Sequence, residues 1–258
     1  MKRAVFTVHM GYTDVINCLA FIDFYREEYD EVIIVSTPIH KNHIDFYIRN
    51  KKGVSSVYGN NTVDLVSRIA ASEGMDNLSI GFDDITRTDR YRDSFRSAFY
   101  NTRKDEHFVK LFYDLYDIPY SVKVDYFNLD RDRSLEDKTY KDFINLIQYD
   151  DYVIYHSSQE DNIKDTMKRY DNCSYVNVNG KIENVFSFIK VLEKAKELHL
   201  VDSVWAATTY LLDAKYSIFK DKKIYLYPYR NRSGGLVKDI SIESLQSPVN
   251  LPNWKIMK

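Results

Sequence analysis

The feature that most constrains the fold is an alternation between short β-branched runs and longer stretches of helical periodicity. In the first part of the chain, strands are expected at 4–9, 31–36, 54–59 and 78–82, and helices near 14–28, 39–50 and 61–73. This alternation is typical of βαβ units, in which helices cover both faces of a parallel sheet. The pattern therefore predicts an α/β, doubly wound fold.

The alternation stops between about 89 and 148, where the sequence is aromatic, charged and helical, and then resumes. Further strands are expected at 151–158, 173–180, 198–203 and 222–229, with helices near 160–169, near 183–195 and up to about 214. A chain of 258 residues is long enough for two such domains. We expect two Rossmann-like doubly wound domains facing across a cleft, an N-terminal one at 1–125 with a helical insertion near 89–120 and a C-terminal one at 126–258.

Composition excludes several classes of protein. The formal net charge is −2, so the chain has no overall basic character suited to nucleic acid. No 18-residue apolar run and no signal-peptide pattern is present, which predicts a cytoplasmic protein without a transmembrane segment. Cys18 and Cys173 lie in or beside apolar runs without metal-ligand spacing, and the "DRD" at 130–132 lies in a charged helical lead-in. We therefore expect no metal site.

Open α/β sheets bind ligands at the carboxyl ends of their strands. In the N-terminal half this edge carries "HMGYTD", which places His9, Gly11, Tyr12 and Thr13 as candidate acceptor residues. Asp14 is the candidate general base, because a carboxylate there could take a proton from an acceptor hydroxyl. The alternative is structural, with Thr13 or Asp14 serving only as an N-cap and His9 packing in the core. His40 and His43 are expected at the surface.

In the C-terminal half the same edge carries three polar loops. At "DS" a helix is expected to begin, and the amides of residues 203–205 could bind a phosphate there, with the Ser203 hydroxyl as a further donor. Asp202 would then point to a ribose hydroxyl or to the backbone. Simple helix capping is the alternative. With the loops "HSSQED" and "NVNGK" and a later arginine, the candidate nucleotide-binding residues are His156, Ser157, Ser158, Asn179, Gly180, Lys181, Asp202, Ser203, Val204 and Arg230.

Three segments carry a family resemblance. "HMGYTDVINCLAFIDFYREEYDEVIIVS" resembles the opening of B-type (GT-B) glycosyltransferases, and "HLVDSVWAATTYLLD" resembles their C-terminal Asp-Ser or Asp-Thr helix start, as in heptosyltransferases. The stretch 112–143 is similar to a linking segment in polysaccharide-biosynthesis glycosyltransferases of bacteria and large viruses. The sequence departs from the motifs of this family at two places. Thr13 stands in place of a second glycine, and Val204 with Trp205 stands in place of small residues.

The resemblance implies metal-independent sugar transfer from a nucleoside-diphosphate sugar to a hydroxyl of a glycan-type acceptor, with no further cofactor. It assigns the acceptor to the N-terminal half with Asp14 as base, and the diphosphate to Ser203 with its following amides and to Ser157 and Ser158. The negative charge on the leaving nucleoside diphosphate would be stabilised by helix N-termini and by the cations Lys181, Arg230 and Arg232. Two alternatives stay open: a non-catalytic nucleotide- or glycan-binding module on a degenerate scaffold, and a sugar-nucleotide epimerase or hydrolase.

Overall fold

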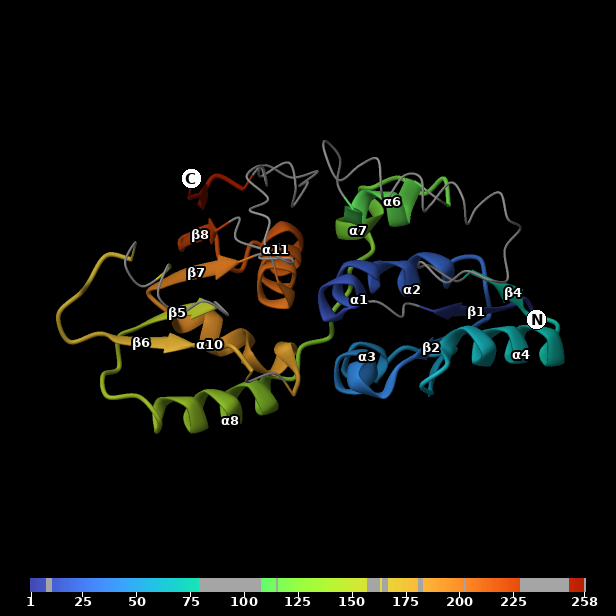
Figure 1. Ribbon diagram of the computed structural model, residues 1–258, viewed down its shortest axis with the longest axis horizontal. Coiled ribbons are helices and arrows are strands. Elements are labelled where there is room, and N and C mark those ends of the chain that lie inside the picture. The colour runs from blue at the N-terminus through green and yellow to red at the C-terminus, as the bar shows by residue number, and fades with distance from the viewer. Residues whose placement is uncertain are drawn as a thin grey trace. The chain divides into compact units, whose positions relative to one another are not determined.

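The chain forms two compact units in the computed structural model, Met1–Asp130 and Arg131–Lys258 (Figure 1). The division lies between Asp130 and Arg131, whereas the sequence analysis placed it between residues 125 and 126. The structure describes residues 1–7, 11–78, 108–114, 116–156, 163, 167–180, 183–201, 203–227 and 251–257.

The first unit is built on a parallel sheet of four described strands in the order β3-β2-β1-β4. The strands are β1 (Arg3–Thr7), β2 (Glu31–Ser36), β3 (Val54–Tyr58) and β4 (Asp76–Asn77). Phe6 is in register with Ile34, and Ile34 with Ser56, so the carboxyl ends of the three longer strands lie along one edge. The predicted strands at 31–36 and 54–59 are confirmed to within a residue. Of the one predicted at 78–82, residues 79–82 lie outside the described residues.

Helices cover both faces of this sheet. The single helix expected over 14–28 is two helices, α1 (Tyr12–Cys18) and α2 (Ala20–Tyr25), separated at Leu19. They are followed by η1 (Pro38–His40), α3 (Lys41–Ile48) and α4 (Thr62–Glu73). The ring of Phe6 packs against Phe21 of α2 on one face, with ring centroids 6.1 Å apart. Val5 points to the other face and packs with Val66 of α4, as the alternation of a strand requires.

Two short helices complete the described part of the first unit, α6 (Phe108–Asp114) and α7 (Val122–Asp125). They lie in and just after the expected insertion, most of which falls outside the described residues. Tyr113 of α6 stacks on Phe21 at 4.3 Å and donates a 2.6 Å hydrogen bond to the carbonyl of Asn17 in α1. These contacts fix α6 against the α1–α2 layer.

The second unit contains a parallel sheet in the order β6-β5-β7-β8-β9. Its strands are β5 (Tyr152–His156), β6 (Ser174–Asn177), β7 (Glu197–Val201), β8 (Lys223–Tyr227) and β9 (Trp254–Ile256). The first four match predicted strands, whereas β9 lies in the tail, where no strand was expected. Its position is fixed by Trp254, whose indole N–H donates to the buried Asp213 at 3.0 Å.

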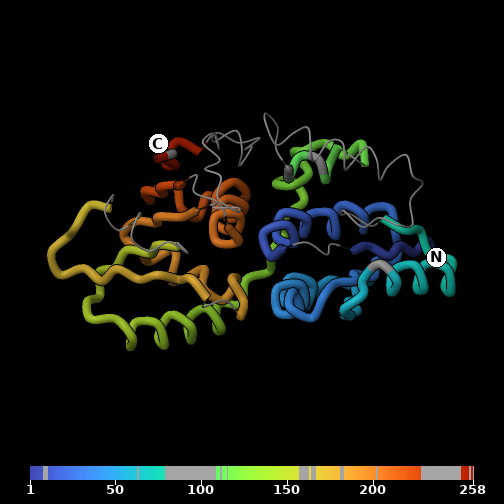
Figure 2. The backbone as a smooth tube through the Cα atoms, viewed as in Figure 1, coloured from blue at the N-terminus to red at the C-terminus, as the bar shows by residue number. Residues whose placement is uncertain are grey.

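The helices described in the second unit are α8 (Arg133–Ile144), η2 (Val185–Phe188), α10 (Ile189–Lys194) and α11 (Val204–Tyr216) (Figure 2). Tyr152 of β5 donates to the Val191 carbonyl of α10 at 2.7 Å, which seals one face of the sheet. The other face buries Val153 and Tyr155 with Ile163 and Met167. Both units thus have the predicted α/β class, with helices packed on parallel sheets.

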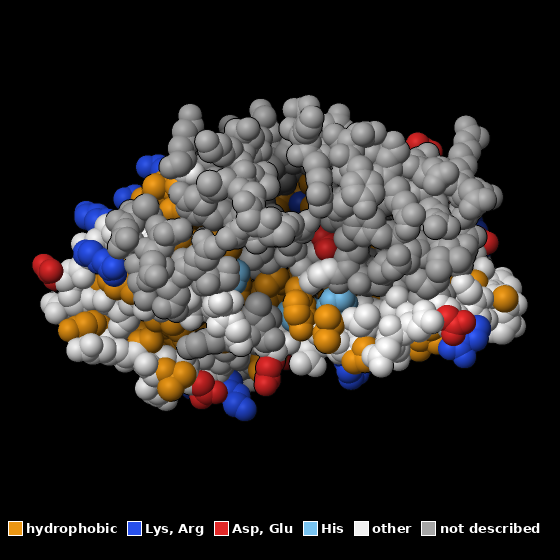
Figure 3. Space-filling model, in the orientation of Figure 1, with side chains coloured by type: hydrophobic (Ala, Val, Ile, Leu, Met, Phe, Trp, Pro, Cys, Tyr) orange, Lys and Arg blue, Asp and Glu red, His pale blue; other side chains and the backbone are white. Residues whose placement is uncertain are grey.

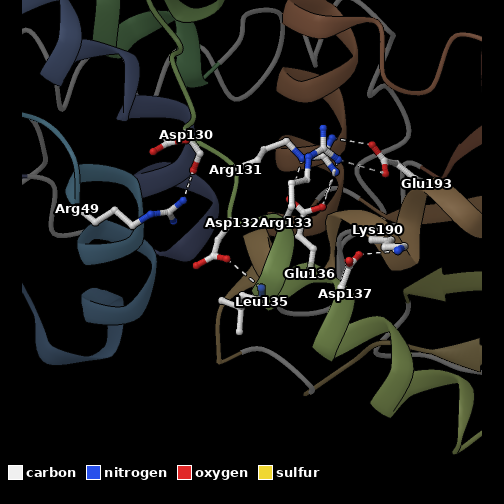
Figure 4. Close-up of polar contacts among 10 residues, drawn as sticks. All are labelled: Arg49, Asp130, Arg131, Asp132, Arg133, Leu135, Glu136, Asp137, Lys190 and Glu193. Carbon is white, nitrogen blue, oxygen red and sulfur yellow. Dashed lines mark hydrogen bonds and ion pairs between the residues drawn. The ribbon is translucent and has the colours of Figure 1, made fainter.

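The residues on either side of the division are each held by their own unit (Figure 4). The carbonyl of Asp130 accepts from Arg49, and its carboxylate accepts from Asn50. The guanidinium of Arg131 binds Glu136 of α8 and Glu193 of α10. The chain therefore passes from contacts within the first unit to contacts within the second over a single peptide bond.

The described surface mixes both signs of charge, with acidic and basic side chains side by side along the lower edge of the face in Figure 3. This agrees with a formal net charge of −2. None of the described helices has the length and apolar character needed to cross a membrane. No cluster of three or more potential metal-ligating side chains occurs among the described residues.

Candidate functional site

The turn after β1 positions Asp14 at the start of α1. Gly11 is the N-cap residue and the helix begins at Tyr12, so neither Thr13 nor Asp14 is the N-cap. The Asp14 carboxylate accepts a hydrogen bond from the Gly11 amide at 2.9 Å, while the Asp14 amide donates to the Gly11 carbonyl at 3.0 Å. Asp14 is only 9% exposed. The turn therefore fixes this carboxylate at the carboxyl end of the central strand, next to an exposed glycine and half-buried Tyr12 and Thr13.

Two buried histidines lie beside this turn, contrary to the expectation that His40 and His43 are at the surface. Their side chains are 0% and 1% exposed. His40 Nδ1 lies 2.9 Å from the Ser36 hydroxyl, and the Tyr12 ring contacts both imidazoles at centroid distances of 5.3 and 5.2 Å. Burial, and then the charge of His40, lowers the pKa of His43 to about 4. His43 is therefore neutral at physiological pH and supports one face of Tyr12.

In the second unit, Ser203 caps α11 as the sequence predicted. Its hydroxyl accepts from the Ala206 amide at 3.4 Å and donates to the Val201 carbonyl at 2.9 Å. The hydroxyl proton is thus used within the protein, and the expected role of Ser203 as a further donor would require that bond to break. Among the hydrogen bonds of the described residues, the amides of Val204 and Trp205 donate to no acceptor. These two N–H groups are the ones that the helix start offers to an anion.

The neighbouring strand ends bring two further candidates together. His156 ends β5, and the Val178 amide extends the β6 ladder to the Tyr155 carbonyl at 3.0 Å. This places Asn179 beside His156. Burial lowers the pKa of His156, and a hydrogen bond that the imidazole donates to the Asn179 side chain partly opposes that shift. A neutral imidazole and an amide therefore form one polar pair at the carboxyl edge of the sheet.

Gly180 follows this pair in a conformation that favours glycine, with φ of +70°. A Cβ built there would meet no atom of the described structure within 4 Å. Glycine is favoured at this position by its positive φ, and its expected role in allowing close approach of a ligand stays a prediction. His156 of β5 also pairs in register with Leu200 of the neighbouring strand β7. Leu200 lies three residues before Ser203 in the chain. The His156–Asn179 pair and the start of α11 thus belong to adjacent strand ends of one sheet.

Several predicted site residues lie outside the described residues, and their roles stay predictions. They are His9, Ser157, Ser158, Lys181, Asp202, Arg230 and Arg232.

The sequence matches no family model and no curated protein. Among solved structures, a glycosyl transferase family 9 protein from Veillonella parvula aligns with a TM-score of 0.55 at 10% identity, over 99% of this chain and 86% of that one. The two chains share a fold. The E. coli heptosyltransferase WaaC with ADP aligns with a TM-score of 0.36 at 11% identity, over 88% of each chain. The same enzyme with ADP-2-deoxy-2-fluoro heptose gives 0.40 at 12%, over 99% and 93%.

The shared fold agrees with the predicted pair of Rossmann-like domains of GT-B type. The resemblance to GT-B proteins noted in the sequence is confirmed at the level of fold, and the likeness to enzymes of large viruses stays a prediction.

One residue that the sequence analysis did not select is Lys123, a lysine of the first unit with only 2% exposure. Its helix α7 has only four residues, so the sequence has no helical period there that could have indicated its burial.

Proposed function

We propose that this protein is a metal-independent glycosyltransferase that moves a sugar from a nucleoside-diphosphate sugar to a hydroxyl of a glycan-type acceptor. The observation that carries the proposal is the carboxyl edge of the second sheet. There the amides of Val204 and Trp205, for which the described residues supply no acceptor, and the His156–Asn179 pair follow adjacent strands. The first amides of a helix, which have no acceptor within the helix, can bind anionic oxygens, and a neutral imidazole with an amide suits the hydroxyls or base of a nucleoside.

The proposed reaction forms one bond and breaks another at the anomeric carbon of the donor sugar. Asp14 takes the proton of the acceptor hydroxyl as that oxygen bonds to the anomeric carbon. The bond from this carbon to the diphosphate breaks, and the diphosphate leaves with the electron pair. Amide dipoles at the start of α11 stabilise its charge, joined by the predicted cations Lys181, Arg230 and Arg232.

Tyr12 is the proposed acceptor contact in the first unit. Its half-buried ring is supported by two buried imidazoles and stands two residues before Asp14. A rigid aromatic ring next to the base offers a flat apolar surface to a sugar ring. Gly11, Thr13 and His9 complete the proposed acceptor loop.

One observation favours a non-catalytic binding module as the second candidate. Asp14 is engaged with the Gly11 amide and Ser203 with the Val201 carbonyl, so both groups already serve the local structure. A sugar-nucleotide epimerase or hydrolase is distinguished from both by forming product without an acceptor.

Calorimetry with UDP, GDP and ADP, followed by nucleotide release from the matching sugar nucleotides with and without a panel of glycan acceptors, tests the proposal. We expect one nucleoside diphosphate to bind and its release from the donor to depend on acceptor. Binding without release would favour the module, and acceptor-independent turnover would favour the epimerase or hydrolase. Absence of binding to all three would overturn the proposal.

A further inference from the structure

The ring of Tyr12 is held at the start of α1 by two buried imidazoles. Its centroid lies 5.3 Å from that of the His40 ring, which is edge-on, and 5.2 Å from that of the tilted His43 ring. His40 Nδ1 lies 2.9 Å from the Ser36 hydroxyl and 3.2 Å from the Thr37 hydroxyl, which fixes this imidazole at the end of β2. Both histidines are at most 1% exposed, whereas Tyr12 is half-buried. Rigid partners therefore support the ring and leave part of the residue accessible.

The hydroxyl of Tyr12 has a different environment from the other phenols of the first unit. Five of these donate to an oxygen atom of the protein, and they belong to Tyr29, Tyr47, Tyr58, Tyr113 and Tyr126. Within the described part of the chain the Tyr12 hydroxyl has no such acceptor, and its oxygen is not buried. Phenylalanine would make the same ring contacts with the two histidines. The hydroxyl is therefore available to a ligand.

The place of Tyr12 in α1 assigns its hydroxyl to the acceptor side of the proposed reaction. Tyr12 is the first residue of the helix, and Asp14 is the third. Side chains two positions apart on a helix do not face each other, so these two residues would contact different parts of one acceptor molecule. A phenol is neutral and both donates and accepts hydrogen bonds, as a sugar hydroxyl does. Its ring can also pack on the apolar face of the same sugar.

We propose that Tyr12 determines acceptor specificity through a hydrogen bond from its hydroxyl to a hydroxyl of the acceptor sugar other than the one that reacts. His40 and His43 are positioning residues, because they hold the ring that carries this hydroxyl. The inference rests on the proposed function, in which the acceptor binds at the start of α1. It narrows the acceptor to a sugar that presents a second hydroxyl at a fixed distance from the reacting one.

Tyr12→Phe keeps the ring and removes only the hydroxyl. With the best acceptor among the methyl glycosides of glucose, galactose and mannose, the acceptor KM should rise roughly three- to tenfold, the scale of one neutral hydrogen bond. The kcat should stay within about twofold and the donor KM should not change, because the lost contact is made equally before and during transfer. An unchanged acceptor KM would overturn the inference.

Monodeoxy derivatives of the same acceptor identify the hydroxyl that Tyr12 contacts. A site that hydrogen bonds a substrate hydroxyl discriminates against the analogue that lacks it. For one derivative without a non-reacting hydroxyl, the wild type should show the rise in KM that Tyr12→Phe causes, and the variant should then equal the wild type. If Tyr12→Phe changes the KM of every derivative by the same factor, its hydroxyl contacts none of these positions and the inference is wrong.

Tyr126→Phe is the matched control in the same unit. Tyr126 is also half-buried, its ring packs edge-on against Phe24 at 5.1 Å, and its hydroxyl donates to Glu27 at 2.7 Å. Removal of this hydroxyl should leave the acceptor KM at the wild-type value. An equal rise in both variants would show that the effect is not specific to Tyr12 and would contradict the inference.

A double-mutant cycle tests the role of the buried imidazoles. His43→Ala removes one of the two rings that hold Tyr12, so it should raise the acceptor KM and leave the donor KM unchanged. In the Tyr12→Phe background the same substitution should have a smaller effect, because the hydroxyl that it positions is already absent. Equal effects in both backgrounds would refute the positioning role. His43→Gln replaces His43→Ala if the latter does not fold.

Binding measured without turnover separates this inference from the proposed function. Saturation-transfer NMR with the three methyl glycosides should show weaker binding to Tyr12→Phe than to the wild type. That result in a protein that transfers no sugar would refute the function and keep the contact. Equal transfer by the wild type and Tyr12→Phe would refute the inference and keep the function. Absence of both binding and transfer for all three glycosides would overturn the inference, whereas calorimetry with nucleotides decides the function separately.

Discussion

The carboxylate of Asp14 and the amide of Gly11 are joined by a 2.9 Å hydrogen bond that caps the start of α1. This bond holds the proposed base in one orientation, and an asparagine at position 14 would keep an oxygen to accept it. Asp14→Asn should therefore retain the fold and donor affinity while lowering turnover by roughly 100-fold or more, the scale of general-base catalysis. Steady-state rates and calorimetry on the same sample measure the two effects.

The matched control for Asp14→Asn is Asp64→Asn. Asp64 is likewise the third residue of its helix, α4, but it is exposed, and it is paired with Arg68 at 3.0 Å. Turnover of this control should stay within about twofold of the wild type, since exposed pairs contribute little. If Asp14→Asn behaves like the control, Asp14 is a structural residue and not the base.

The Val204 amide can be removed without removing the helix. Proline is well tolerated at the first helical position, and Ser203 before it has an extended backbone with φ of −163° and ψ of 174°, which suits a residue preceding proline. Val204→Pro should weaken nucleoside-diphosphate binding roughly tenfold or more, because a hydrogen bond to a charged group is lost. Calorimetry with the best-binding nucleoside diphosphate measures the change.

Val204→Ala controls for the change in the buried side chain, because it keeps the amide and shortens the same residue. Its affinity should stay near the wild-type value, and both variants should retain the helical circular dichroism signal. Equal affinities for the proline and alanine variants would remove the start of α11 from the diphosphate site.

The local pattern predicted the elements around the site well, because their apolar positions follow a regular period. β2 occupies the predicted residues, and Ser203 caps a helix as its type and place indicated. The helical period of the segment 40–47 also indicated that His40 and His43 are buried, although they were expected at the surface. His40, His43, Ile44 and Tyr47 follow the spacing i, i+3, i+4, i+7 of a buried helix face.

Other features depend on contacts between distant parts of the chain. Strand β9 is held in place by a hydrogen bond from Trp254 to Asp213, which lies 41 residues earlier in the chain. No local pattern in the tail could indicate this contact. The burial of Lys123 likewise depends on distant parts of the chain, since its own helix has only four residues and packs on α2. The sequence could therefore select Asp14 as an acid at a strand end, but not Lys123 as a buried lysine.

The buried His43 predicts a pH dependence of stability. Its pKa in the folded state is about 4, below the ordinary value of 6.5, because burial disfavours the charged form. Between these values the unfolded chain binds more protons, so stability is complete above about pH 6.5 and decreases as the pH falls toward 4. The contribution is on the order of 3 kcal/mol.

Urea unfolding of wild type and His43→Gln at pH 7 and at pH 4.5 measures this contribution. The variant lacks the titrating group, so its free energy of unfolding should decrease less over this interval than that of the wild type. The comparison uses the difference between the two pH values, which cancels any constant cost of the substitution. Parallel decreases in both proteins would show that His43 is already charged in the folded state or exposed to water.

Loss of Arg131 should strongly destabilise the second unit. Its Nε donates to Glu136 at 2.7 Å and its Nη1 to Glu193 at 2.6 Å, and Glu136 is 0% exposed (Figure 4). Burial lowers the pKa of Arg131, but the hydrogen bonds to the two glutamates outweigh this effect and raise it overall. Arg131→Met leaves the buried Glu136 without its main partner and should cost about 3–5 kcal/mol in unfolding free energy.

The double variant Arg131→Met with Glu136→Leu should recover most of that loss, because replacing both partners of a buried pair with apolar groups is often close to neutral. Lys190→Met is the control between the same two helices. Its partner Asp137 is 52% exposed, so removing the pair should cost less than about 1 kcal/mol. Denaturant midpoints of the four proteins measure these differences. If Arg131→Met lowers the unfolding free energy no more than Lys190→Met does, the charge of Glu136 is solvated. The contacts of Arg131 with Glu136 and Glu193 then do not hold α8 on α10.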